Sequence, residues 1–142
     1  YFVLVIIQII YGAFVAGLDA GGGFNTWPKM GEYWIPDAVY QLDPLWKNFV
    51  EGRYGVQFIH RILALIIVAF VIYIWKTGRK LELVTNQKRT LNFLLGIVLL
   101  QTFLGVFTLI LVVPIWLAAL HQIGAFFLLT ATTYSLFIFS KY

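Results

Sequence analysis

The sequence predicts an all-α membrane protein, in which residues 1–142 form a single four-helix transmembrane domain. Hydrophobic residues make up 61% of the chain and charged residues 11%, whereas soluble domains carry about 25% charged residues. The apolar residues gather in long runs, each close to or above the roughly 20 residues that cross the hydrocarbon core of a bilayer. These runs predict helices at about residues 1–18, 54–75, 91–113 and 115–139. Two sequence patterns that each occur twice indicate that the helices form two parallel helix-pair repeats.

The charges between the apolar runs predict the orientation of the chain. The segment from Lys76 to Arg89 carries five basic residues and one acidic residue, whereas residues 19–53 carry three basic and five acidic residues. Because cytoplasmic loops are enriched in Lys and Arg, we expect the Lys76–Arg89 segment and both chain ends on the cytoplasmic or matrix side. Residues 19–53 then form a long outer loop between the first and second helices.

The repeat relates the first helix to the third and the second helix to the fourth. The pattern Q-x-x-x-G-x-F begins at Gln8 in the first helix and again at Gln101 in the third. The pattern H-x-I-x-A begins at His60 in the second helix and at His121 in the fourth. Parallel repeats in membrane proteins are related by an axis along the membrane normal. We therefore expect both histidines at one depth, facing each other across the bundle.

His60 and His121 are the candidate cofactor-binding and metal-binding residues, and the chain has no other histidine. An imidazole inside a membrane segment is costly and needs a partner, so it marks a functional site by default. Two imidazoles without nearby carboxylates or thiols do not complete a zinc tetrahedron. They are sufficient for a haem iron, whose porphyrin supplies the equatorial nitrogens, and such an iron favours electron transfer. The pattern thus predicts a haem iron held by both histidines, while the catalytic residues stay unknown.

Plainer interpretations of the same residues stay open. His60 alone can be an interfacial histidine that reaches toward water, and His121 alone can form a hydrogen bond between helices. Gly12 and Gly105, expected at the depth of the histidines, either clear space for a flat macrocycle or let the helices pack closely. The repeat favours the ligand interpretation over these alternatives.

Other polar residues of the helices have weaker assignments. Gln8 and Gln101 are expected to form hydrogen bonds between helices rather than to bind a metal. Arg53, Arg61 and Lys47 near the outer end are candidates for pairing with haem propionates, although basic residues at helix ends usually act as anchors.

Composition excludes several classes of function. The chain has no cysteine, which excludes disulfides, thiolate ligands and iron–sulfur clusters. Its net charge of +4 does not indicate nucleic acid as a partner, because the basic residues lie where membrane topology places them. The first apolar run lacks a basic leader and a cleavage site, so it is not a signal peptide. The chain begins inside its first helix, and we expect it to be part of a longer polypeptide.

Several longer stretches carry a resemblance to a known family. The sequence reads GAFVAGLDAGGGFNTWPKMG from Gly12 to Gly31, PLWKNF from Pro44 to Phe49 and VQFIHR from Val56 to Arg61. The fourth helix opens with PIWLAALHQ at residues 114–122. Over essentially the whole chain, these stretches resemble the haem A synthase family, in the form found in alphaproteobacteria and mitochondria.

The resemblance implies an activity and an architecture. Members of the family oxidise a methyl group of haem O to the formyl group of haem A, which serves cytochrome c oxidase. The usual fold has two similar four-helix halves, of which one receives haem O and the other holds haem b between two histidines. This sequence is similar to the second half, so His60 and His121 match the axial ligands of haem b.

The resemblance also implies partners and a location. The partners are the lipid bilayer, the other four-helix half in the same polypeptide or a second subunit, the haem O donor and the cytochrome c oxidase assembly machinery. The expected location is the bacterial cytoplasmic (inner) membrane or, alternatively, the mitochondrial inner membrane. Substrate residues of the other half are missing here, which leaves the activity of this half alone uncertain.

Two other functions remain possible on the sequence. The first is a b-type cytochrome subunit that transfers electrons without a biosynthetic role. The second is a protein without haem, such as a transporter or an assembly factor, whose histidines pack or relay protons. Conversion of added haem O separates the synthase from the first alternative, and a haem absorption band separates it from the second.

Overall fold

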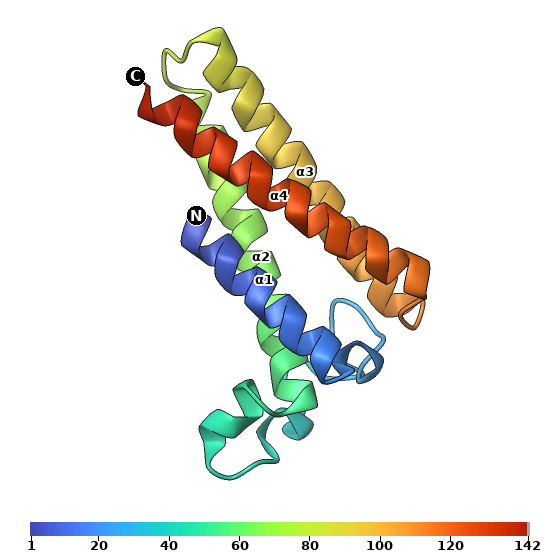
Figure 1. The fold of residues 1–142 in the computed structure, drawn as a ribbon. Coiled ribbons are helices and arrows are strands. Elements are labelled where there is room, and N and C mark those ends of the chain that lie inside the picture. Colours follow the sequence, from blue (N-terminus) through green and yellow to red (C-terminus); the bar gives the residue numbers. More distant parts are fainter. Residues whose placement is uncertain (142) are drawn as a thin grey trace.

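The structure is a computed structural model that describes residues 1–141, and within these residues it is all-helical and contains no β-strand (Figure 1). The four α-helices are α1 (Phe2–Gly17), α2 (Arg53–Gly78), α3 (Thr85–Ile110) and α4 (Ile115–Ser140). The last three are long and apolar enough to cross a membrane. Helix α1 has 16 residues, which span about 24 Å at 1.5 Å per residue. The predicted fold class, an all-α membrane protein with four helices, is confirmed.

Helix α3 departs most from the boundaries that hydropathy predicts. It begins at Thr85 rather than near residue 91, because residues 85–90 are polar but still helical. The side chain of Gln87 accepts a hydrogen bond from the backbone N–H of Val84 at 3.1 Å, which satisfies a donor at the start of the helix. The helix ends at Ile110 rather than Val113, because Val112 and Val113 have φ angles of 62° and 55°. Left-handed backbone of this kind cannot continue a right-handed helix.

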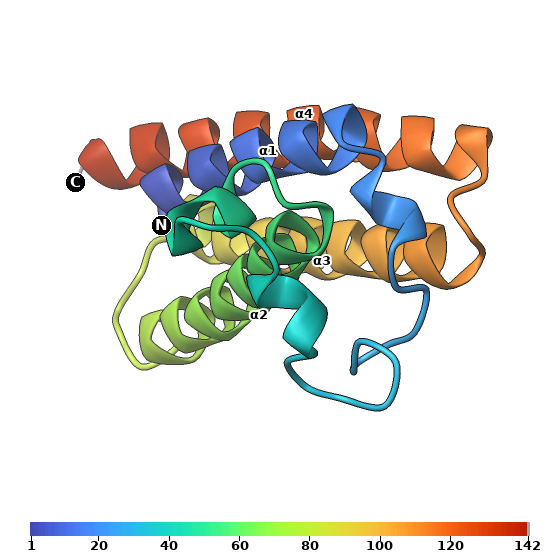
Figure 2. The same ribbon diagram turned by 90° about the horizontal axis from the view of Figure 1, so that it is seen from below.

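The helices pack around a ring in which α1 contacts α2, α2 contacts α3, α3 contacts α4 and α4 contacts α1. Helices α2 and α4 therefore occupy opposite corners of the bundle (Figure 2). All four helices contribute to one buried apolar core, which consists of Val5, Ile67, Val71, Leu94, Val98, Leu128 and Ala131. We call the end with the α2–α3 connection and the C-terminal end of α4 the inner end, and the opposite end the outer end (Figure 1).

The connection between α1 and α2, residues 18–52, folds over the outer end (Figure 1). It contains three short 3₁₀-helices: η1 (Ala20–Gly22), η2 (Asp37–Tyr40) and η3 (Leu45–Phe49). Gly21 lies against the α3–α4 turn, since a Cβ there would be 2.9 Å from Cγ2 of Val113. Asn25 donates a hydrogen bond to the carbonyl of Leu109 at 2.9 Å. The outer segment is thus bound to the far helix pair as well as to its own.

Candidate functional site

The two histidines lie at similar depths on opposite corners of the bundle. His60 is seven residues after the start of α2, and His121 is six residues after the start of α4. At 1.5 Å per residue, both lie about 10 Å along their helices from the outer end. Because α2 and α4 are diagonal, the interior of the bundle separates the two helices that carry the imidazoles.

Each histidine is joined to the preceding helix by a glutamine. The side-chain amide of Gln8 on α1 donates to the backbone carbonyl of His60 at 3.1 Å. The side-chain amide of Gln101 on α3 donates to the backbone carbonyl of His121 at 2.8 Å. Gln8 Nε2 also lies 3.3 Å from His60 Nε2. The expectation that both glutamines form hydrogen bonds between helices is confirmed.

Each imidazole also lies against a glycine of that preceding helix. A Cβ added at Gly12 would stand 3.3 Å from Cε1 of His60, and one added at Gly105 would stand 2.8 Å from Cε1 of His121. Any larger residue would push the ring away. The two glycines therefore set the space in which the rings lie, and close packing of the helices accompanies this role.

The same polar atoms are left without hydrogen-bond partners in both helix pairs. Within the described residues, Nδ1 of His60 and of His121 is buried and unpaired, as is Oε1 of Gln8 and of Gln101. A buried polar atom without a partner costs about 1–3 kcal/mol. Nε of Arg53 and of Arg61 is buried and unpaired as well, so such atoms are not confined to the matched set. A ring nitrogen that bound a metal would be satisfied.

The donor set suits haem and does not suit a metal held by protein alone. Residues 1–141 contain no group of three or more His, Cys, Asp or Glu side chains that would hold a metal ion. Two imidazoles leave the equatorial positions of an iron to a porphyrin, so the residues present fit a haem. A groove of about 730 Å³ between α3 and α4 reaches Gln101, the residue that binds the His121 carbonyl. The candidate site is argued from its paired side chains.

Arg61, next to His60, binds the outer segment. Its guanidinium donates to the carbonyls of Phe24 at 2.6 Å, Thr26 at 2.9 Å and Lys29 at 3.2 Å. One turn earlier, Gln57 exchanges two hydrogen bonds with the backbone of Phe24, at 3.2 and 3.0 Å. Both side chains are buried. This pair fastens the outer segment directly above the helix turn that carries His60.

This fastening role of Gln57 and Arg61 was not predicted from the sequence. Their spacing of four residues places them on one face of a helix. This spacing is the sequence feature that could have indicated a shared role. The other suggested propionate partners lie farther out: Arg53 pairs with Asp19 at 3.1 Å, and Lys47 is part of η3. Three N–H groups of Arg61 bind loop carbonyls and are not free for a propionate.

The chain is similar to known proteins along nearly its whole length. It is 44% identical over 140 residues to a protein named "Heme A synthase" from Flavobacterium psychrophilum, covering 97% of this chain and 41% of that protein. It is 42% identical over 127 residues to "Heme A synthase COX15" from Homo sapiens, covering 89% of this chain and 31% of that protein. The chain thus spans about two fifths or less of the length of these relatives.

No solved structure matches the chain. The family described as cytochrome oxidase assembly protein, COX15-CtaA, matches residues 1–133. Because this match covers most of the sequence, the chain belongs to the COX15-CtaA family of cytochrome oxidase assembly proteins.

Proposed function

We propose that the chain is the haem b-binding half of a haem A synthase, with His60 and His121 as the axial ligands of one haem b. The observation that carries the proposal is the matched set of contacts around each imidazole. Each histidine has a glutamine on its backbone carbonyl and a glycine against its ring. The two sets lie on helix pairs whose histidine-bearing helices are diagonal.

The protein would position and orient the haem and would surround it with apolar side chains. Gln8 and Gln101 hold the helix turns that carry the histidines, and Gly12 and Gly105 let the rings lie close to the neighbouring helix. The core formed by Ile67 and its neighbours lies toward the inner end and keeps that part of the bundle closed. A haem bound by two imidazoles supplies reversible one-electron chemistry with no open iron position.

The relatives named heme A synthase suggest where this electron transfer is used. We infer that it supports oxidation of a methyl group of haem O to the formyl group of haem A, for cytochrome c oxidase. Haem O would bind the other four-helix half, either in the same polypeptide or in a second subunit. Such a protein lies in a bacterial cytoplasmic membrane or in the mitochondrial inner membrane, where the haem O donor and the oxidase assembly machinery are its partners.

An absorption spectrum of the complete polypeptide, oxidised and dithionite-reduced, tests the proposal. We expect a low-spin b-type spectrum in the parent protein and its loss, or conversion to high spin, in both His60→Ala and His121→Ala. Gln122→Ala on α4, next to the second histidine but exposed, is the matched control and should keep the spectrum. A folded parent protein that takes up no supplied haem would contradict the ligand assignment.

Added haem O tests the biosynthetic part separately. A hydroxymethyl or formyl product that depends on both histidines supports the synthase. A normal b-type spectrum without any conversion of haem O favours a b-type cytochrome that only transfers electrons.

A further inference from the structure

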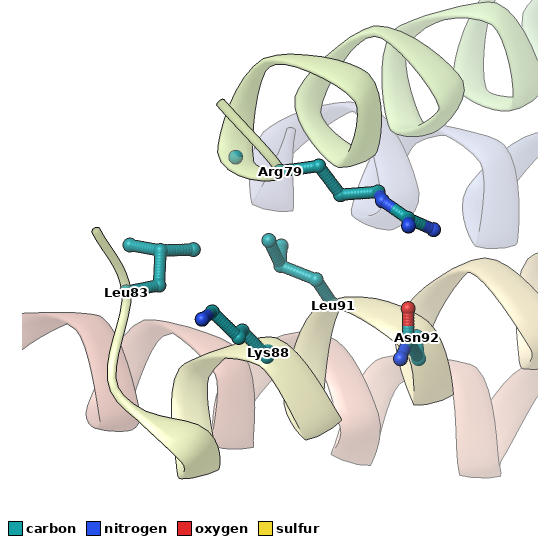
Figure 3. A pocket seen from close by; sticks show the side chains of 6 residues that line it. Arg79, Leu83, Lys88, Leu91 and Asn92 are labelled. Carbon is teal, nitrogen blue, oxygen red and sulfur yellow. The ribbon is translucent and has the colours of Figure 1, made fainter. Parts of the chain in front are cut away.

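A second site lies at the inner end, far from the histidines, where α2 meets α3. It is a cavity of about 290 Å³ lined by Gly78, Arg79, Leu83, Lys88, Leu91 and Asn92. In Figure 3, Arg79 from the end of α2 lies on one side, and Lys88, Leu91 and Asn92 from α3 lie on the other. Leu83 belongs to the connecting segment between the two helices. The walls of this cavity thus combine two cations with apolar side chains.

Within residues 1–141, the cations of the cavity form no salt bridge with a carboxylate. Among the described residues the salt bridge is Arg53 to Asp19, which lies at the outer end. The segment around the cavity adds three more basic residues, Lys76, Lys80 and Arg89, against the single acid Glu82. The cavity therefore lies in a strongly positive part of the molecule and suits an anion.

The arginine of the cavity is held in place by aromatic and amide contacts. The guanidinium carbon of Arg79 lies 4.8 Å from the centre of the Trp75 ring. The indole N–H of Trp75 donates to the side-chain carbonyl of Asn92 at 2.8 Å, which links α2 to α3. Asn92 itself lines the cavity. The cation is thus positioned by a contact between the two helices before any anion arrives.

An apolar groove adjoins the same asparagine. Asn92 also lines a groove of about 730 Å³ between α3 and α4, which runs along α3 past Gly96 and Leu100 to Gln101 and Leu104. A ligand at this place would meet cations at the inner end and hydrocarbon-like side chains along the helices. A phospholipid presents a phosphate and acyl chains in the same order along the membrane normal.

We propose that this cavity binds the phosphate of an anionic phospholipid, with Arg79 and Lys88 as its counter-charges and an acyl chain along the α3–α4 groove. Basic pockets between transmembrane helices on the cytoplasmic or matrix side bind anionic lipid headgroups. The charge distribution of the loops predicts that the α2–α3 connection faces that side. The adjoining apolar groove favours a lipid over a free phosphate ion.

Native mass spectrometry of the complete polypeptide in phosphatidylglycerol nanodiscs tests the site. The test variant is Arg79→Gln with Lys88→Gln. The matched control is Lys80→Gln with Arg89→Gln, which removes the same charge from neighbours that do not line the cavity. We expect retained phosphatidylglycerol to fall roughly 30-fold in the test variant, because it removes two contacts to the phosphate that are each worth about 1 kcal/mol. We expect little loss in the control, because Lys80 and Arg89 do not line the cavity.

Equal losses in both double variants would overturn the proposal, since they would show a general effect of positive charge and no cavity site. Retention of phosphatidylcholine as strong as that of phosphatidylglycerol would also overturn it. Displacement of the lipid by millimolar inorganic phosphate would assign the site to a free anion instead. Arg79→Lys with Lys88→Arg keeps both charges and should restore lipid binding, and unchanged thermal unfolding of the test variant shows that its fold is intact.

Discussion

The two helix pairs, α1–α2 and α3–α4, share one pattern of buried residues but differ in how their helices are connected. Val5 lies three residues before Gln8, and Val98 lies three residues before Gln101, and both valines are buried. In the partner helices, Ile67 and Leu128 are buried seven residues after their respective histidines. The predicted repeat thus gains support from burial as well as from the sequence patterns.

The connections differ greatly. Residues 18–52 join α1 to α2, whereas residues 111–114 join α3 to α4. The buried side chains Gln57 and Arg61, which bind the long segment, have no counterpart in the second pair, because Ala118 and Gln122 stand at the matching positions of α4. The comparison teaches that both histidines lie within the shared pattern, whereas the contacts of Gln57 and Arg61 with the loop belong to one pair.

Replacing Arg61 is expected to produce the largest difference between the pairs. Arg61→Leu removes three hydrogen bonds to backbone carbonyls of the outer segment and should cost about 2–3 kcal/mol of unfolding free energy. Gln122→Leu at the matching position of α4 should change it by no more than about 0.5 kcal/mol. Thermal unfolding and protease cleavage within residues 18–52 measure both effects. Similar losses in the two variants would show that the difference between the pairs is not energetic.

Replacing the glycines that face the imidazole rings tests the pattern that both helix pairs share. Gly105→Ala places a Cβ 2.8 Å from the His121 ring and should cost about 1–3 kcal/mol through overpacking. Gly12→Ala, at 3.3 Å from the His60 ring, should cost less. Gly96→Ala on α3 meets no neighbour within 4 Å and should stabilise the helix by about 0.5–1 kcal/mol.

Thermal unfolding followed by absorption and circular dichroism measures this series. We expect the order Gly105→Ala, Gly12→Ala, Gly96→Ala from least to most stable. A destabilised Gly96→Ala variant, or equal effects at all three positions, would show that ring packing does not decide the outcome.

Replacing the glutamines should have a smaller effect. Gln101 is buried and its bond to the His121 carbonyl is 2.8 Å long, whereas Gln8 is half-buried and its bond is 3.1 Å long. Gln101→Leu should therefore lower the unfolding free energy by about 1 kcal/mol, and Gln8→Leu by about 0.5 kcal/mol. Denaturant unfolding of both variants checks the order. A larger loss for Gln8→Leu would contradict the geometric ranking.

Removing the outer ion pair should have the smallest effect. The side chains of Arg53 and Asp19 are 40% and 86% exposed, so water and salt screen their attraction. Asp19→Asn should shift stability by less than about 0.5 kcal/mol. A thermal midpoint that falls as far as that of Arg61→Leu would show that the loop is held from its edge and not from Arg61.

Much of the fold could be predicted because apolar run length and loop charge depend on local sequence. The same run length missed the start of α3, since residues 85–90 are polar yet helical and stabilised by Gln87. It also missed the end of α3, which is set by the left-handed backbone of Val112 and Val113. Hydropathy predicts which residues cross the hydrocarbon core. It does not predict the polar residues by which a helix extends beyond that core.

The candidate site could also be predicted only in part from the sequence. His60 and His121 could be singled out because a repeated polar residue in an apolar helix is rare and visible. The carbonyls that Arg61 binds could not, because they belong to residues 24–29 of an irregular segment whose path depends on tertiary packing. Every residue has a backbone carbonyl, so a side chain that binds carbonyls requires no particular residue types in its partner segment.

The central claim is that two equivalent imidazoles hold a single haem. Electron paramagnetic resonance of the oxidised complete polypeptide, with haem quantified per protein, tests it most directly. We expect one low-spin bis-imidazole signal per chain, lost to the same extent in His60→Ala and in His121→Ala. A signal that survives either substitution unchanged would contradict the claim, because the haem would then not depend on both histidines.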